Sequence, residues 1–260
     1  MLSKDPWIGY VKPGRIFGNL YFVGTHPSSV HMIDTDDGLV LIDTGYLNNL
    51  YLVIQNIWEL GFNPMDIKHI LISHGHYDHS NGAPALAHMS GAKTYIGKED
   101  LKLVTGEYTD GTPIPKYLDP DVLLEDGDVL TFGNTTVKCV HTPGHTDGVM
   151  SFFFNVTDGE KTYRAGMHGG VGLNTLNKPF MTKNNLPFEN RQKYFDSLKK
   201  LANEHVDIFI GNHVGNNDTE GKLERSRTSA ENPFIDPTEW PRFLDKCRIK
   251  LEELIESEKE

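Results

Sequence analysis

The segment HGHYDH, residues 74–79, constrains this chain more than any other feature, because it gathers three imidazoles and one carboxylate within six residues. It stands at the end of an apolar run, Ile67 to His74, that is typical of a buried strand. Imidazole is the commonest transition-metal ligand, and a carboxylate suits a harder or bridging position. His74 and His76 are two residues apart, so an extended strand end directs both to one side. The following turn can direct Asp78 and His79 at a second point, and the segment therefore predicts two metal ions.

Two further histidines stand just past the ends of other apolar strands, as His74 does. His145 follows the predicted strand Thr135 to Val140, and Pro143 and Gly144 force a turn before it. His213 follows the predicted strand Val206 to Gly211. Ligands that are distant in sequence and presented by strand-end loops are the usual anatomy of a catalytic metal site.

The other histidines carry no such positional signal. For His168 the sequence leaves two roles open, a residue of the substrate site and an ordinary loop residue. The remaining ones are interpreted as ordinary surface or core histidines: His26, His31, His69, His88, His141 and His205.

The predicted elements are mostly strands followed by a helix, twice over, and this order predicts two sheets packed together with helices outside, in two similar halves. Asp36-Asp37-Gly38 predicts the turn of a hairpin within Val30 to Gly45. The other predicted strands are Leu20 to Gly24, Lys93 to Ile96, Val129 to Phe132 and Val149 to Asn155. The predicted helices are Asn48 to Leu60, Pro84 to Met89, Phe188 to Asn203 and a C-terminal helix. Asp236 and Pro237 are expected to be the N-cap and first residue of the last helix.

Two stretches without a period are expected to be loops that shape a pocket. They are Thr105 to Pro120, rich in Gly, Pro, Asp and Tyr, and Gly169 to Pro187, rich in Asn and Gly. Their composition does not identify a ligand.

Composition excludes several other classes of protein. Two cysteines cannot form a disulfide framework, and a net charge of -11 argues against a nucleic-acid surface. No window approaches 18 apolar residues, so no membrane span is expected. The first residues lack the apolar region of a signal peptide, which favours a cytoplasmic protein, although a chain with its signal removed would look the same.

The motifs LIDTG, HGHYDHSNGAP, HTPGHTDG and FIGNH together resemble the metallo-β-lactamase superfamily over Leu20 to His213. The resemblance implies an α+β fold, an αββα four-layer sandwich with the metal site at one edge of the sheets. We expect residues 1–260 to form one such domain, since the proposed ligands come from both halves. The resemblance also implies two zinc ions, one on His74, His76 and His145 and one on Asp78, His79 and His213. Asp43, in LIDTG, matches a position just behind the metals.

One departure from the family pattern is informative. Many members carry a bridging Asp where this chain has Met167, and neither Cys139 nor Cys247 falls there. A non-ligand at this position, with His79 on the second metal, resembles the B3 subclass of metallo-β-lactamases. The segment 231–237, ENPFIDP, is also similar to that subclass. A one-residue shift in this alignment would bring His168 nearer the metal.

These features predict a zinc-dependent hydrolase that acts on a small molecule. Two zinc ions would lower the pKa of a shared water towards about 7, and the resulting hydroxide would attack a carbonyl. Asp78 would both bind metal and orient that hydroxide. No G-x-S-x-G string supports a serine nucleophile instead.

The substrate class stays open at this point. The B3 resemblance favours a cyclic amide of the β-lactam type. The alternative is a lactone, ester or thioester hydrolase acting on a cytoplasmic metabolite. An iron-dependent oxidoreductase and a non-catalytic module are the other rivals, while the acidic charge and the missing bridging Asp disfavour a nuclease.

Overall fold

The first sheet of the computed structural model, which describes residues 5–259, has seven strands in the order of the chain. Strands β1 to β4 run antiparallel to their neighbours, whereas β4 to β7 are parallel. The turn at Asp36-Asp37-Gly38 joins β3 to β4, as predicted. The strands are β1 (Gly14–Phe17), β2 (Leu20–Phe22), β3 (His31–Asp34), β4 (Leu39–Ile42), β5 (Ile67–Ile72), β6 (Lys93–Gly97) and β7 (Val122–Leu124).

The second sheet has five strands in the order β12-β11-β10-β9-β8. Only the β11–β12 pair is parallel. The strands are β8 (Val129–Phe132), β9 (Thr135–His141), β10 (Met150–Thr157), β11 (Thr162–Met167) and β12 (Ile208–Phe209).

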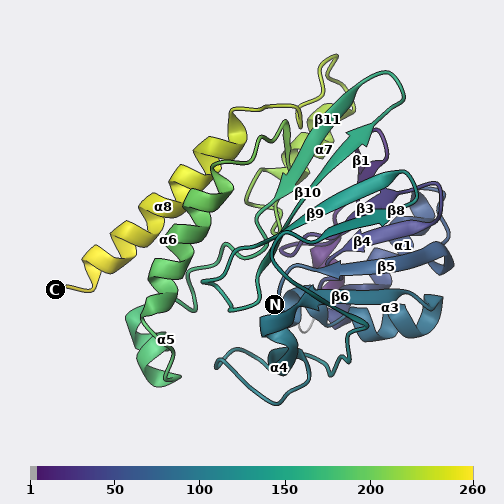
Figure 1. Cartoon of the computed structure of the whole chain (residues 1–260). Coiled ribbons are helices and arrows are strands. Elements are labelled where there is room, and N and C mark those ends of the chain that lie inside the picture. The colour runs from purple at the N-terminus through teal and green to yellow at the C-terminus, as the bar shows by residue number, and fades with distance from the viewer. Residues whose placement is uncertain (1–4, 260) are drawn as a thin grey trace.

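Helices cover the outer face of each sheet. In Figure 1, α1 (Leu50–Glu59) and α3 (Ala83–Ser90) lie against the first sheet, while α6 (Glu189–Leu201) and α8 (Glu239–Ser257) lie against the second. The shorter helices are α2 (Tyr77–Ser80), α4 (Leu101–Val104), α5 (Lys178–Lys183) and α7 (Thr219–Ser226). Single 3₁₀ turns are η1 (Pro6–Gly9), η2 (Leu47–Asn49), η3 (Pro64–Asp66) and η4 (Lys98–Asp100). The order helix, sheet, sheet, helix confirms the predicted αββα sandwich.

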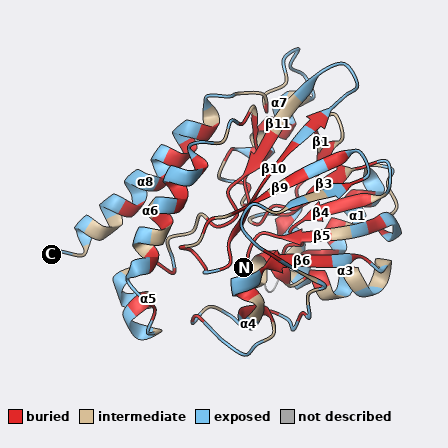
Figure 2. Ribbon diagram, viewed as in Figure 1, coloured by how far each residue is buried: buried red, intermediate tan, exposed pale blue. Residues whose placement is uncertain are grey.

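Strand β10 shows why several strands of this protein have apolar residues at nearly every position. Successive side chains of a strand point to opposite faces. Phe152 and Phe154 pack into the core between the sheets, and Phe153 packs into the outer core under α6 and α8. Both faces of these strands are therefore buried, as the red strands in Figure 2 show.

Several boundaries differ from the sequence-based expectations. No strand was predicted at β1, β7 or β11, and no helix at α7. The stretch 169–187 was expected to be irregular but contains α5, which Asn177 caps by accepting a hydrogen bond from the backbone N–H of Phe180 at 2.9 Å. The prediction of Asp236 as the N-cap of the last helix was wrong by two residues. The N-cap of α8 is Thr238, and the carboxylate of Asp236 accepts a hydrogen bond from the backbone N–H of Thr238 in the turn before the helix.

Two predictions reach beyond what the fold tests. A single domain over residues 1–260 stays a prediction, and the ends of that range, 1–4 and 260, lie outside the described residues. Among residues 5–259, every helix is too short or too polar to cross a lipid bilayer. A cytoplasmic location also stays a prediction.

Candidate metal centre

The HGHYDH segment forms the turn between β5 and α3, at one edge of the first sheet. His74 and His76 follow the end of β5, and both are buried. Asp78 and His79 lie on the one-turn helix α2, which redirects their side chains. The strand end and the helical turn thus present these side chains from different backbone conformations.

The second sheet brings its two histidines to the same edge. His145 lies in the turn between β9 and β10, where Gly144 has φ +143°. A Cβ at Gly144 would lie 2.6 Å from that of Tyr194, so only glycine lets this turn rest on α6. His213 follows β12 and pairs with Ser28 of the β2–β3 loop in an isolated antiparallel bridge.

All six predicted ligands thus converge on one place. The Nδ1 of His76 lies 2.9 Å from the Nε2 of His145, and the Nε2 atoms of His79 and His213 are 3.3 Å apart. The Asp78 carboxylate lies 3.4 Å from the Nε2 of His79 and 3.7 Å from that of His213. Ligand atoms within 4.8 Å of one another form two groups that share His74: one with His76 and His145, the other with Asp78 and His79. His213 belongs to neither group, so its place on a second metal stays a prediction.

The donor atoms of this cluster fit a metal. The Nε2 of His74 is buried and has no hydrogen-bond partner among the described residues, although an unpaired buried polar atom is costly. Burial lowers the pKa of His74, His145 and His213, so these imidazoles are neutral and keep the lone pair that metal binding needs. Nitrogen donors with one carboxylate are a set that zinc accepts.

Charge within the cluster is concentrated on one pair. Burial lowers the pKa of His79, but Asp78 and Asp43 outweigh burial and raise it to about 10. Burial raises the pKa of Asp78, and His79 outweighs this and lowers it. A metal and the proton on His79 would therefore compete for the same nitrogen.

Asp43 lies directly behind His79, the position that its place in LIDTG predicts. Its Oδ2 accepts a hydrogen bond from the Nδ1 of His79 at 2.7 Å. Its Oδ1 accepts one from the backbone N–H of Ser73, also at 2.7 Å. Asp43 has φ +61°, a left-handed conformation that is uncommon outside glycine. The carboxylate thus orients His79 and ties it to the end of β5.

Two carboxylates near the cluster were missed by sequence reasoning. Asp110, in the loop 105–120, accepts a hydrogen bond from the Nε2 of His76 at 2.7 Å. Asp100 is buried and accepts bonds from the N–H groups of Gly75 at 2.7 Å and Gly148 at 2.8 Å, which joins the two ligand loops. Neither residue stands at a strand end or in a motif, so no local pattern distinguishes it from other loop aspartates.

Met167 and His168 lie apart from the converging side chains. Met167, at the end of β11, packs in the core between the sheets. The His168 ring is buried with its centroid 5.8 Å from that of Tyr194, and burial lowers the pKa of His168 to about 3. Its Nδ1 accepts a hydrogen bond from the N–H of Gly170. Neither residue belongs to the two ligand groups.

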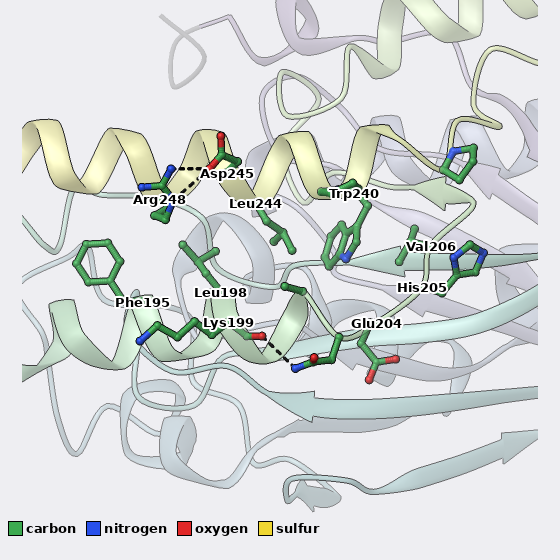
Figure 3. Close-up of a pocket in the computed structure, with 14 residues that line it drawn as sticks. Phe195, Leu198, Lys199, Glu204, His205, Val206, Trp240, Leu244, Asp245 and Arg248 are labelled. Carbon is green, nitrogen blue, oxygen red and sulfur yellow. Dashed lines mark hydrogen bonds and ion pairs between the residues drawn. The ribbon is translucent and has the colours of Figure 1, made fainter.

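A cavity of about 310 Å³ adjoins the cluster, and the loop 105–120 contributes to it, as expected. His145, Asp110, Tyr108, Lys102 and Leu186 are among the residues that line it. A larger cavity of about 550 Å³ lies elsewhere, between α6 and α8, and none of its lining residues belongs to the cluster (Figure 3). The chemistry belongs at the smaller cavity, because within residues 5–259 both groups of possible metal ligands lie beside it.

The two-sheet sandwich and the histidine cluster at its edge define a metallo-hydrolase. Residues 23–158 match the family model described as the metallo-beta-lactamase superfamily. The chain belongs to this superfamily.

Solved structures of metallo-beta-lactamases are similar over nearly the whole chain. BJP-1 of Bradyrhizobium japonicum, a subclass B3 metallo-beta-lactamase, is 26% identical with a TM-score of 0.90, covering 100% of this chain and 98% of that one. The metallo-beta-lactamase FEZ-1 of Legionella gormanii is 29% identical with a TM-score of 0.88, covering 96% and 98%.

Curated relatives are more diverse. YobT of Bacillus subtilis, an uncharacterized protein, is 29% identical over 140 residues, 51% of this chain, and the match spans 59% of YobT. PksB of the same organism, a probable polyketide biosynthesis zinc-dependent hydrolase, is 24% identical over 63% of this chain and 68% of its own length. The hydroxyacylglutathione hydrolase GloC of Haemophilus influenzae is 26% identical over 78% of this chain and 89% of its own.

Proposed function

We propose that this protein is a dizinc hydrolase of the B3 metallo-β-lactamase type that cleaves a cyclic amide. One zinc would be held by His74, His76 and His145. The other would be held by Asp78, His79 and His213. The observation that carries the proposal is the convergence of these six side chains from three separate segments of the chain.

The B3 assignment has two further supports. The full-length similarity to BJP-1 and FEZ-1 joins this chain to enzymes whose names describe metallo-beta-lactamases. Met167, at the position of the bridging Asp in many relatives, is apolar and buried in the core. A ligand set without a residue at that position leaves His79 to complete the second site.

The reaction adds water across the C–N bond, with the hydroxyl going to the carbonyl carbon and a proton to the leaving nitrogen. Bound zinc would supply a water of lowered pKa and a Lewis acid for the carbonyl oxygen. Asp78 would help to hold the metal and orient this water through its carboxylate. With metal bound, Asp43 and Asp110 would hold His79 and His76 in the tautomer whose proton faces the carboxylate and whose other nitrogen faces the metal. Tyr108 and Leu186 offer the substrate aromatic and apolar surface beside His145.

A lactone, ester or thioester hydrolase acting on a cytoplasmic metabolite is the second candidate. GloC and PksB support it, because their names describe a hydroxyacylglutathione hydrolase and a zinc-dependent hydrolase. The same residues would serve, since all these substrates present a carbonyl to attack.

A substrate panel separates the two. Zinc-loaded protein is assayed with β-lactams, lactones and hydroxyacyl thioesters, alongside His76→Ala and Asp78→Ala. His88→Ala, a histidine outside the cluster, is the matched control. We expect β-lactam turnover that both site variants lose and the control keeps. Turnover of thioesters or lactones alone would favour the second candidate, and activity surviving in both site variants would contradict the mechanism.

A further inference from the structure

The β2–β3 loop contacts proposed ligands from both sheets. The Oγ of Ser28 donates a hydrogen bond to the Oδ2 of Asp78 at 3.1 Å. The same residue forms the isolated bridge with His213. Hydrogen bonds from the N–H of Val214 to the O of Pro27 and from the N–H of Ser29 to the O of Asn212, at 3.0 and 2.9 Å, hold this loop against the His213 turn. Ser28 is fully buried, so water does not compete with its hydroxyl for the Asp78 carboxylate.

We infer that Ser28 is a positioning residue for the metal held by Asp78, His79 and His213. The inference rests on the proposed dizinc function. A carboxylate rotates about its last bond unless a partner fixes it. The Ser28 hydroxyl fixes Asp78 by occupying a lone pair of Oδ2, and the backbone of the same residue sets the distance to His213. Ser28 thus holds Asp78, from the first sheet, and His213, from the second sheet, in fixed positions relative to each other.

This effect is confined to one of the two metal positions. The ligands of the other position have other partners: the Nδ1 of His74 lies 3.2 Å from the Oγ of Ser73, and His76 donates to Asp110 at 2.7 Å. His145 donates through Nδ1 to the carbonyl of Gly172 at 2.8 Å. None of these contacts involves the β2–β3 loop. Loss of the Ser28 hydroxyl therefore lowers the affinity for one metal ion and leaves the affinity for the other unchanged.

The adjacent Ser29 provides a matched control. It is equally buried and lies on the same loop, but its Oγ has no hydrogen-bond partner among the described residues. If a buried hydroxyl here served only to fill space, Ser28→Ala and Ser29→Ala would behave alike.

Zinc titration against a chromophoric chelator tests the inference without relying on activity. Wild type is compared with Ser28→Ala, Ser28→Thr, which keeps the hydroxyl, and Ser29→Ala, with circular dichroism to verify folding. We expect two zinc equivalents in wild type and in Ser29→Ala. Ser28→Ala should bind one equivalent unchanged and the other about 10- to 100-fold more weakly. Ser28→Thr should bind both as wild type does.

The outcomes separate this inference from the proposed function. Wild type that binds a single equivalent contradicts the dizinc proposal and the role of Ser28 with it. Wild type with two equivalents and Ser28→Ala with the same two affinities overturns the role of Ser28 alone. Equal weakening in Ser28→Ala and Ser28→Thr, or in Ser28→Ala and Ser29→Ala, also overturns it, because the hydroxyl on Asp78 would not be the cause.

Discussion

Single residues of the site divide into those with a sequence signal and those without one. The four ligand candidates in residues 74–79 stand in one segment, and His145 and His213 each follow an apolar strand. Asp110, Asp100 and Ser28 are isolated polar residues in loops. Their partners are set by how distant loops pack, for example Ser28 against Asp78, so spacing along the chain cannot reveal them.

Asp110 is expected to support His76. Asp110→Asn removes the negative charge that receives the Nε2 proton of His76, so affinity for the metal on His76 should fall about 10- to 100-fold. Chelator-competition titration measures this. Asp119→Asn, an exposed carboxylate of the same loop, is the control and should bind as wild type does. Equal affinities in the two variants would contradict a role for Asp110.

His31 should make stability depend on pH. It is buried, donates to the carbonyl of Gly211, and burial lowers its pKa to about 4. In the unfolded chain the His31 side chain binds a proton below about pH 6.5, whereas in the folded chain it does so only near pH 4. Between these values, stability should fall with decreasing pH, by roughly 3 kcal/mol from this group.

The variant His31→Gln, whose amide can still donate to Gly211, removes this titration. Urea denaturation between pH 7 and pH 4 should show a shallower loss of stability in the variant than in wild type. Parallel curves would mean that His31 does not contribute.

Secondary-structure elements were predictable where their period is long and clear. Helix α1 and the β3–β4 hairpin lie where Asn48 to Leu60 and Asp36-Asp37-Gly38 predict them. Strands β1 and β7, of four and three residues, are too short for a period to appear. Strand β11 reads TYRAGM, whose Arg and Gly mask the alternation that its burial in the second sheet requires. These elements are specified by pairing with neighbours rather than by their own residues.

The two ligand loops are joined at the element scale by Asp100. Its Oδ2 accepts bonds from Gly75 N–H and the Thr146 hydroxyl, both at 2.7 Å, and its Oδ1 accepts from Gly148 N–H. Asp100→Ala leaves these buried donors unpaired, at about 1–3 kcal/mol each. The free energy of unfolding in urea should therefore fall by about 3 kcal/mol or more. Glu99→Ala, its exposed neighbour, should change it little, and equal small effects would contradict the joining role.

The site forms only when the two sheets pack against each other, because each sheet supplies some of its side chains. Side chains from residues 74–79 meet His145 and His213 at the shared edge, and the core between the sheets, including Phe152 and Phe154, fixes their relative position. The αββα order was predictable from the motifs together with the order of elements, strands and then a helix, twice over. The loops beside the cavity were also predicted, but the side chains that line it were not, because these loops have no period that fixes which residues point inward.

Zinc should stabilise the entire fold. A ligand that binds only the folded chain adds about 4 kcal/mol when its concentration is 1,000 times its dissociation constant. We expect the thermal unfolding midpoint to rise on zinc loading and to fall after chelation. His76→Ala should show a smaller rise than His88→Ala, and an equal rise would place the zinc elsewhere.

The central claim is that six side chains from two sheets hold two zinc ions. Mass spectrometry of the metal content of the purified, zinc-equilibrated protein tests it most directly. The account predicts two zinc ions per chain and no stoichiometric iron. Iron as the bound metal would instead favour an oxidoreductase, and fewer than one metal ion per chain would contradict a catalytic metal centre.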